Sequence, residues 1–174
     1  MAGTAIRIAN KEDAELIANI SRLTFFETFA TENTKENMNK FMSEQFSKEK
    51  LMAEVGAPGN IFLLAIDEEG PAGYVRMKET EHNESLGAVP AIEISRIYAM
   101  PHKIGKGVGP LLMQACIDMA KKMNKKIIWL AVWEKNQRGI SFYKKWGFER
   151  FGEHDFILGD DVQLDWLMKK DLSQ

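Results

Sequence analysis

A glycine-rich segment, His102-Lys103-Ile104-Gly105-Lys106-Gly107-Val108-Gly109, has the residue types and spacing of an anion-binding turn. It follows a strand-like stretch that ends at Ala99 and precedes a helical pattern that begins at Pro110. Glycine lets the backbone approach an anion closely, and the N–H groups of a helix's first turn point toward that anion. The segment therefore predicts a site for a phosphate-bearing ligand.

The spacing of the glycines disfavours two familiar kinds of phosphate loop. A P-loop needs G-x-x-x-x-G-K-[ST], and this segment has neither that spacing nor the Ser or Thr that binds magnesium. A dinucleotide fingerprint needs G-x-G-x-x-G near the first strand and an acidic residue about 20 positions later, where this chain has Trp129. The further motifs of a protein kinase are also absent from the sequence. The plain structural alternative is a glycine-rich helix start that binds nothing.

The hydrophobic periodicity around this segment predicts the elements that must position it. Strands are expected at Ile6–Ile8, Ile61–Ile66, Ala72–Lys78, Ala91–Ala99, Ile127–Trp133, Phe148–Ile157 and Gln163–Lys169. Helices are expected from Lys11 to about Thr31, over Asn33–Val55 with an interruption near Ser43 or Ser47, and over Gly107–Lys122 and Gln137–Trp146. A polar loop is expected over Glu79–Val89. This order predicts an α/β class (α+β with one mixed sheet) with helices on both faces of the sheet.

Length and composition set the broad class of protein. A chain of 174 residues predicts one domain, 1–174, with its own hydrophobic core. The net charge of -2 disfavours nucleic acid and anionic membranes as partners. The single Cys116 excludes an internal disulfide and suits a reducing, cytoplasmic location. We expect neither a signal peptide nor a membrane span, because the sequence has no basic N-terminal region with an apolar core and no apolar run of about 20 residues.

Two segments resemble the signature motifs of the GNAT superfamily of acetyl-CoA-dependent N-acetyltransferases. Ile97-Tyr98-Ala99-Met100-Pro101, followed by Gly105-Lys106-Gly107-Val108-Gly109-Pro110-Leu111-Leu112, looks like its motif A. Val132-Trp133-Glu134-Lys135-Asn136, followed by Phe142-Tyr143-Lys144-Lys145-Trp146-Gly147-Phe148, looks like its motif B. The resemblance covers about Ile92 to Phe148 and extends more loosely to Met168. The C-terminal part is most similar to bacterial PaiA-like spermidine/spermine N-acetyltransferases, and the N-terminal half matches in element order alone.

The resemblance implies a GNAT fold with a twisted, mostly antiparallel central sheet and acetyl-CoA as the cosubstrate. It also implies that the backbone of Ile104, Gly105, Lys106, Gly107, Val108 and Gly109 binds the pyrophosphate. Main-chain groups of Ile97, Tyr98 and Ala99 would pair with the pantetheine arm, where the fourth and fifth strands separate. The family motif carries Gln or Arg where this chain has Ile104, so a side-chain donor is lost while the backbone donors remain. Lys103 or Lys106 could add positive charge there.

Tyr143 and Glu93 are the candidate catalytic residues by the same resemblance. A tyrosine at the position of Tyr143 lies near the cofactor sulfur in the family, and a phenol can protonate a leaving thiolate. Some members carry a glutamate at the position of Glu93 that acts as a base through water. Each side chain has a structural alternative, aromatic packing for Tyr143 and an ion pair or a solvated charge for Glu93. Asn136 matches a residue that often contacts the cofactor, or it is simply a helix N-cap.

The remaining polar residues leave the acceptor open. His82, His102 and His154 are isolated in sequence, and no pair has metal-ligand spacing, so no metal site is predicted. A cluster of aspartates could bind a polyamine or could be a solvated turn; its members are Asp155, Asp160, Asp161 and Asp165. The leading hypothesis is an N-acetyltransferase for a small primary amine, such as a polyamine. Alternatives are protein or peptide amino groups as acceptors, a non-catalytic CoA-binding regulatory module and, less in keeping with the glycine spacing, a dinucleotide oxidoreductase. A homodimer is compatible with such a fold.

Overall fold

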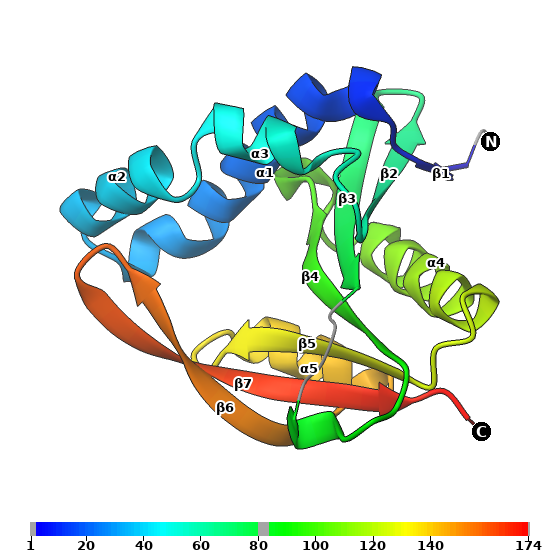
Figure 1. Cartoon of the computed structure of the whole chain (residues 1–174). Coiled ribbons are helices and arrows are strands. Elements are labelled where there is room, and N and C mark those ends of the chain that lie inside the picture. The colour runs from blue at the N-terminus through cyan, green and yellow to red at the C-terminus, as the bar shows by residue number, and fades with distance from the viewer. Residues whose placement is uncertain (1–2, 80–83, 174) are drawn as a thin grey trace.

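The computed structural model describes residues 3–79 and 84–173, which form one mixed sheet with helices on both sides (Figure 1). The strands are β1 (Ala5–Ile8), β2 (Asn60–Asp67), β3 (Gly70–Glu79), β4 (Ala91–Ala99), β5 (Ile127–Trp133), β6 (Glu149–Leu158) and β7 (Asp161–Asp171). The α-helices are α1 (Ala14–Phe29), α2 (Lys35–Glu44), α3 (Lys48–Glu54), α4 (Val108–Lys122) and α5 (Gln137–Lys145). Short 3₁₀ helices occupy Lys11–Asp13, Ala30–Glu32, Glu84–Leu86 and Pro101–Lys103.

The strand order is β1-β2-β3-β4-β5-β7-β6. Among these strands only β4 and β5 pair in parallel, and every other neighbouring pair is antiparallel. A mostly antiparallel mixed sheet was predicted, and the structure confirms it. In Figure 1 the strands β2 to β4 run upright while β5, β7 and β6 run across the lower part of the molecule, so the sheet twists strongly at its centre.

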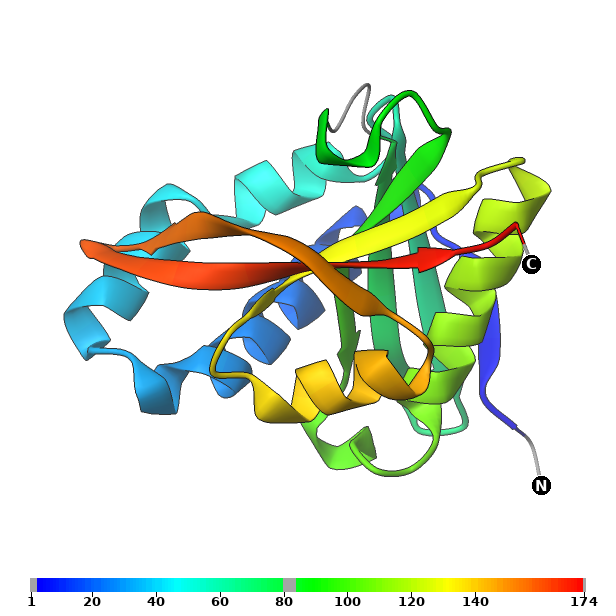
Figure 2. The same ribbon diagram turned by 90° about the horizontal axis from the view of Figure 1, so that it is seen from below.

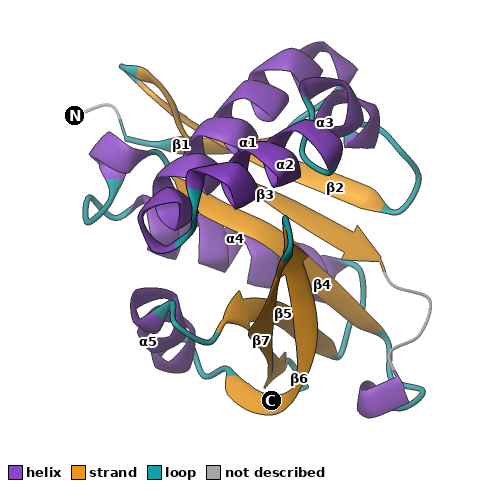
Figure 3. Cartoon of the chain, turned by 90° about the vertical axis from the view of Figure 1, so that its left-hand side faces the viewer, coloured by secondary structure: helices purple, strands orange, loops and turns teal. Residues whose placement is uncertain are grey.

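The two faces of the sheet are covered by different helices (Figure 3). On one face Leu112 of α4 and Ile140 of α5 pack in one apolar cluster with side chains of the central strands, such as Ile92. On the other face α1, α2 and α3 form two further apolar clusters, in which Phe25 and Tyr74 are both buried. The predicted coverage of both faces is therefore confirmed.

Local sequence signals explain where the N-terminal helices begin and end. The hydroxyl of Thr34 accepts a hydrogen bond from Asn37 N–H at the start of α2, and Ser47 does the same for Lys50 N–H at the start of α3. The predicted interruption of the helical region near Ser47 is thus the point where Ser47 caps the start of α3. The polar segment Glu79–Val89 contains the last residue of β3 and a 3₁₀ turn, while its residues 80–83 lie outside the described residues.

The β6–β7 hairpin reaches across to the N-terminal helices, as the view in Figure 2 shows. Asn37 Oδ1 accepts a hydrogen bond from Asp160 N–H at 2.9 Å, and Lys40 Nζ lies 2.5 Å from Asp160 Oδ1. The amide of Gln163 donates to Asn33 Oδ1 at 2.5 Å. These contacts connect the tip of the hairpin to α2 and to the segment before it. Within the described residues, no helix is long and apolar enough to cross a membrane.

Candidate active site

The parallel strands β4 and β5 separate in the middle of the sheet. Their pairing ends at Ile94 and Leu130, while β5 continues alongside β7 to its last residue, Trp133. In the β3–β4 register Arg76 pairs with Arg96 and Met77 with Ile94, so Ser95 is the extra residue of a β-bulge. A bulge bends its strand and increases its twist. From Ser95 to Ala99 the edge of β4 that faces β5 therefore has no strand partner, as the resemblance implied.

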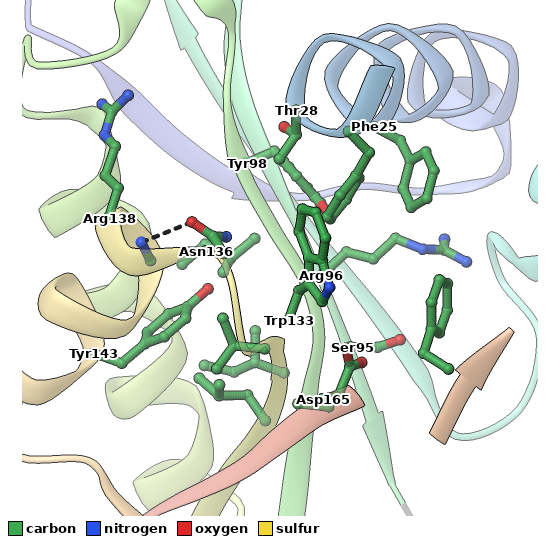
Figure 4. Close-up of a pocket in the computed structure, with 18 of the residues that line it drawn as sticks. Phe25, Thr28, Ser95, Arg96, Tyr98, Trp133, Asn136, Arg138, Tyr143 and Asp165 are labelled. Atoms are coloured by element: carbon green, nitrogen blue, oxygen red, sulfur yellow. Dashed lines mark hydrogen bonds between the residues drawn. The ribbon is translucent and has the colours of Figure 1, made fainter. Parts of the chain in front are cut away.

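A cavity of about 570 Å³ opens where the two strands separate. One wall comes from β4 and β5, a second from α5 and the start of α4, and a third from α1 and the β6–β7 hairpin. Eight of the candidate cofactor-binding and catalytic residues line it, namely Glu93, Ile97, Tyr98, Ala99, Ile104, Gly109, Asn136 and Tyr143. Segments that are far apart in the chain thus meet at one place in the fold (Figure 4).

The glycine-rich turn at the start of α4 presents free backbone donors. Gly105 and Gly107 have φ values of 79° and 87°, a left-handed conformation that favours glycine, and Gly107 is the residue before α4. The first hydrogen bond into α4 runs from Leu111 N–H to Gly107 O. Among the described residues the N–H groups of Gly105, Gly107, Val108 and Gly109 donate to no protein acceptor. The space that a side chain would occupy at Gly105 and Gly107 is open. This turn fits a pyrophosphate.

The side chains of this turn point in different directions. The ammonium group of Lys103 is buried and lies 2.6 Å from Asp67 Oδ2, and it also contacts Glu69 on the same β2–β3 turn. Its charge is therefore matched inside the protein, and the expectation that Lys103 could supply charge to the ligand is wrong. Lys106 is exposed, and Ile104 is 43% exposed at the mouth of the cavity. Val108 is buried in the core, so it can contribute only its backbone.

Helix α5 and its N-cap place Tyr143 and Asn136 on one wall of the cavity. In Figure 4 the hydroxyl of Tyr143 points away from α5 toward the cavity, and among the described residues it has no hydrogen-bond partner. Desolvation raises the pKa of Tyr143, so its proton is held at neutral pH. Asn136 caps α5, because its Oδ1 accepts the N–H of Gly139 at 2.9 Å. The N-cap interpretation of Asn136 is confirmed, although the residue also lines the cavity.

Glu93 and Tyr98 are on the face of β4 that is turned toward α1. Both residues line the cavity, and Tyr98 also stacks on Tyr74 with ring centroids 6.0 Å apart. Burial raises the pKa of Glu93, although the nearby charges of Lys78 and Arg76 lower it in part. Glu93 forms no ion pair within the part of the chain that the structure describes. A carboxylate in this setting has a raised proton affinity, which suits a base.

The structure also brings to the cavity residues whose role the sequence left open, among them Asp165 of the aspartate cluster and His154. Trp133 and Asp165 are directly opposite each other in the β5–β7 pairing, and His154 faces Asp165 from β6. Arg96 lines the cavity and is bound to Glu54 of α3, with N–O distances of 2.7 and 3.1 Å. No signal along the sequence connects Trp133, His154 and Asp165, because their proximity depends on the pairing of β5 with β7 and of β7 with β6.

The other histidines and aspartates have different surroundings. His102 is exposed and does not line the cavity, and His82 lies outside the described residues. Asp160 pairs with Lys40, while Asp155 and Asp161 line a second cavity of about 230 Å³ on the far side of Trp133. Only Asp165 of the aspartate cluster lines the large cavity. In the described ranges no group of three or more His, Cys, Asp or Glu side chains could hold a metal ion.

Comparisons with known proteins agree with this geometry. Residues 15–148 match the Acetyltransferase (GNAT) family. A protein of Lactobacillus delbrueckii described as an uncharacterised N-acetyltransferase is 36% identical over 168 residues, which is 96% of each chain. A spermidine N(1)-acetyltransferase of Thermoplasma acidophilum is 29% identical over 159 residues, covering 88% of this chain and 94% of the relative.

Solved structures show the same fold. The crystal structure of a PaiA N-acetyltransferase from Thermoplasma acidophilum in complex with coenzyme A superposes with a TM-score of 0.76 and 25% identity, over 97% of this chain and 99% of that chain. A putative acetyltransferase of Salmonella typhimurium with acetyl-CoA superposes with a TM-score of 0.72 at 20% identity, over 98% and 95% of the two chains. The chain belongs to the GNAT family and is an acetyl-CoA-dependent N-acetyltransferase.

Proposed function

We propose that this enzyme transfers the acetyl group of acetyl-CoA directly to a small primary amine, with a polyamine as the first candidate acceptor. The observation that carries the proposal is the cavity between β4 and β5, which Tyr143 lines from one wall and Glu93 from another. Two carboxylates, Glu93 and Asp165, line the same cavity and could attract a cationic amine. The names of the Thermoplasma spermidine N(1)-acetyltransferase and of a probable spermine N(1)-acetyltransferase from Bacillus subtilis, 34% identical over 91 residues, support a polyamine.

The cosubstrate would lie across the separated strands. The free N–H groups from Gly105 to Gly109 would bind its pyrophosphate, with help from the positive end of the α4 dipole. The unpaired edge of β4 from Ile97 to Ala99 would pair with the pantetheine arm, as an added strand pairs with a sheet edge. The thioester would then lie between Tyr143 and Glu93, in the middle of the cavity.

In this arrangement each group has one chemical task. The nitrogen of the neutral amine attacks the thioester carbon and then loses a proton to Glu93 through a water molecule. A backbone N–H near Ala99 would donate to the oxygen that becomes negative. The carbon–sulfur bond breaks, and the phenol of Tyr143 protonates the departing thiolate. The raised pKa of Tyr143 keeps the phenol protonated until the thiolate forms.

A thiol-release assay over a panel of polyamines, amino acids and peptides tests the proposal. We expect release with at least one small amine, and we expect Tyr143→Phe to lower kcat about 10- to 100-fold while the Kd for acetyl-CoA changes less than about twofold. Glu93→Gln is expected to lower kcat similarly. The matched control is Tyr74→Phe, because Tyr74 is fully buried and lies outside the cavity. Acetyl-CoA binding without release on any acceptor would indicate a non-catalytic CoA-binding protein and would overturn the proposal.

A further inference from the structure

The cavity contains an ionisable pair to which the proposed mechanism gives no proton-transfer step. His154 of β6 and Asp165 of β7 are directly opposite each other in the hairpin, and His154 Nε2 lies 3.5 Å from Asp165 Oδ2. Both residues line the cavity that Glu93 and Tyr143 also line. The pair comes from the third wall, which α1 and the β6–β7 hairpin build, and not from the elements that would bind the cosubstrate.

The two members of the pair differ in their access to solvent. The side chain of Asp165 is 13% exposed, while that of His154 is 49% exposed. Within the described residues no Lys or Arg forms an ion pair with Asp165. Burial raises the pKa of Asp165, and the neighbouring His154 opposes that shift in part. A largely buried carboxylate without a fixed cation favours the binding of a cation that enters the cavity.

The other groups around the cavity leave this role to Asp165. The remaining charged or titratable side chains that line it are Glu93, Arg96, Tyr98, Arg138 and Tyr143. Arg96 is already bound to Glu54, and helix α1 contributes the uncharged side chains of Phe25, Thr28 and Phe29. Glu93 and Asp165 are therefore the two carboxylates that line the cavity, and Asp165 is the one that a half-exposed imidazole faces at 3.5 Å.

We propose that Asp165 binds the ammonium group of the acceptor and takes its first proton, which His154 then passes to solvent. The inference rests on the acetyl transfer proposed above and assigns the step that precedes it. The amine enters as R–NH₃⁺, which has no lone pair, and it must lose one proton before its nitrogen can attack. The half-exposed imidazole of His154 can accept that proton from the carboxylic acid at one ring nitrogen and release a proton to solvent from the other.

The protons balance over the full reaction. The first proton of R–NH₃⁺ leaves through Asp165 and His154, and the resulting R–NH₂ attacks the thioester. The second proton moves from nitrogen to Glu93 after the carbon–nitrogen bond forms. The carbon–sulfur bond breaks as Tyr143 gives its proton to sulfur, and Tyr143 then regains a proton from Glu93 through water. The products are the amide, CoA–SH and one proton in solvent.

The inference is tested by measuring kcat/KM of the Asp165→Asn variant at a series of pH values, with the amine from the panel that the wild type acetylates fastest. At neutral pH we expect kcat/KM for the amine to fall about 100-fold, with the KM for acetyl-CoA changed less than about twofold. The variant can use only the neutral amine, whose fraction rises with pH, so the deficit should shrink about tenfold per pH unit toward the amine's own pKa. His154→Gln should lower kcat/KM about 3- to 10-fold at neutral pH. The matched control is Glu153→Gln, an exposed neighbour that pairs with Arg150 and should have no effect.

A deficit that is equal at all pH values would show that Asp165 is merely structural, and an unchanged kcat/KM in Asp165→Asn would also overturn the inference. A binding measurement separates the inference from the proposed function. Calorimetric titration of the same amine, or of spermidine if no amine reacts, into the CoA-loaded protein should show binding that Asp165→Asn weakens at least about tenfold. A wild-type protein that acetylates no amine yet binds one through Asp165 would overturn the proposed function alone. Binding that does not depend on Asp165 would overturn the inference alone.

Discussion

The ammonium group of Lys103 lies 2.6 Å from the carboxylate of Asp67, so the turn between β2 and β3 is bound directly to the segment that leads into the glycine-rich turn. Glu69 on the same turn contacts the same ammonium group. Hydrogen bonding to Lys103 lowers the pKa of both carboxyl groups. Lys103 thus stabilises the glycine-rich turn through its contacts with the β2–β3 turn, while Lys106 remains exposed.

We expect Lys103→Met to raise the KM for acetyl-CoA about 5- to 10-fold and to lower the urea midpoint of unfolding, because Asp67 loses its partner and the turn loosens. Lys106→Met removes a charge of the same kind from the exposed side. It should raise the KM in a salt-dependent way and leave the urea midpoint unchanged. Steady-state kinetics and urea unfolding of both variants check this contrast. Equal midpoints for the two variants would contradict the supporting role of Lys103.

Restoring a side-chain donor at position 104 should tighten cosubstrate binding. Ile104 is 43% exposed at the mouth of the cavity, so a longer polar side chain fits without disturbing the core. An arginine there can form charge-assisted hydrogen bonds to a pyrophosphate. We expect Ile104→Arg to lower the Kd for acetyl-CoA about 3- to 10-fold, measured by calorimetry, with Ile104→Leu as the control. A Kd that both variants leave unchanged would show that the pyrophosphate does not pass this residue.

Gly73 permits β3 to lie close to the part of β4 that would pair with pantetheine. A Cβ atom at this position would lie 2.6 Å from Tyr98 O and 3.0 Å from Leu112 Cδ1. Gly73→Ala should therefore destabilise the protein by about 2 kcal/mol and raise the KM for acetyl-CoA, because the backbone of β4 must move. Gly109→Ala is the matched control for stability, since its nearest added contacts are ordinary ones of 3.6 Å to Phe142. Urea unfolding of both variants measures the difference, and equal stabilities would contradict the expected clash.

The start of the N-terminal helix region should show a defined pH dependence of stability. Asp13 accepts hydrogen bonds from Arg7 at 2.7 and 2.8 Å and from Asn10 N–H at 2.9 Å. These bonds, led by that of Arg7, lower the pKa of Asp13 from 3.8 to about 2. A carboxyl group whose pKa is lower in the folded state stabilises the protein above its unfolded pKa, and this contribution is lost as the pH falls toward about 2.

Asp13→Ala should therefore be less stable than the wild type by about 1 kcal/mol at neutral pH, and the difference should shrink once the pH falls below about 4. Urea unfolding at a series of pH values measures it. Glu12→Ala, an exposed neighbour in the same 3₁₀ turn, serves as the control. A difference that stays constant down to the lowest pH would mean that the ionised form of Asp13 contributes nothing.

The periodicity of the sequence predicted the elements well, because each one has its own local signal. Gly147, with a φ of 86°, ends α5 as expected, and Ser47 begins α3 at one of the two positions considered for a break. The boundaries of β7 were harder to predict than those of β6. Strand β6 has the predicted length and is shifted by one residue, to Glu149–Leu158. Strand β7 extends beyond the predicted Gln163–Lys169 at both ends, because its pairing with β5 and β6 continues past its own apolar pattern.

The two halves of the candidate site differ in how far the sequence could predict them. Tyr143 and the glycine-rich turn belong to contiguous motifs, and both were placed on the right elements. Asp165 was one of four aspartates, and His154 one of three histidines, among which the sequence could not choose, because their position depends on long-range strand order. Lys103 was misjudged because its partner Asp67 is 36 residues earlier in the chain.

The bonds between the β6–β7 hairpin and the segment around α2 have a consequence for how acceptor preference can change. Asn33, Asn37 and Lys40 hold Gln163 and Asp160, so the wall of the cavity that includes Asp165 is fixed from outside the cosubstrate site. Substitutions at these contacts would change the shape of that wall while leaving the glycine-rich turn and Tyr143 intact. The segment around α2 and the β6–β7 hairpin can therefore change, in evolution or by design, to suit a different amine. The central segment from β4 to α5, which would bind acetyl-CoA, can stay constant.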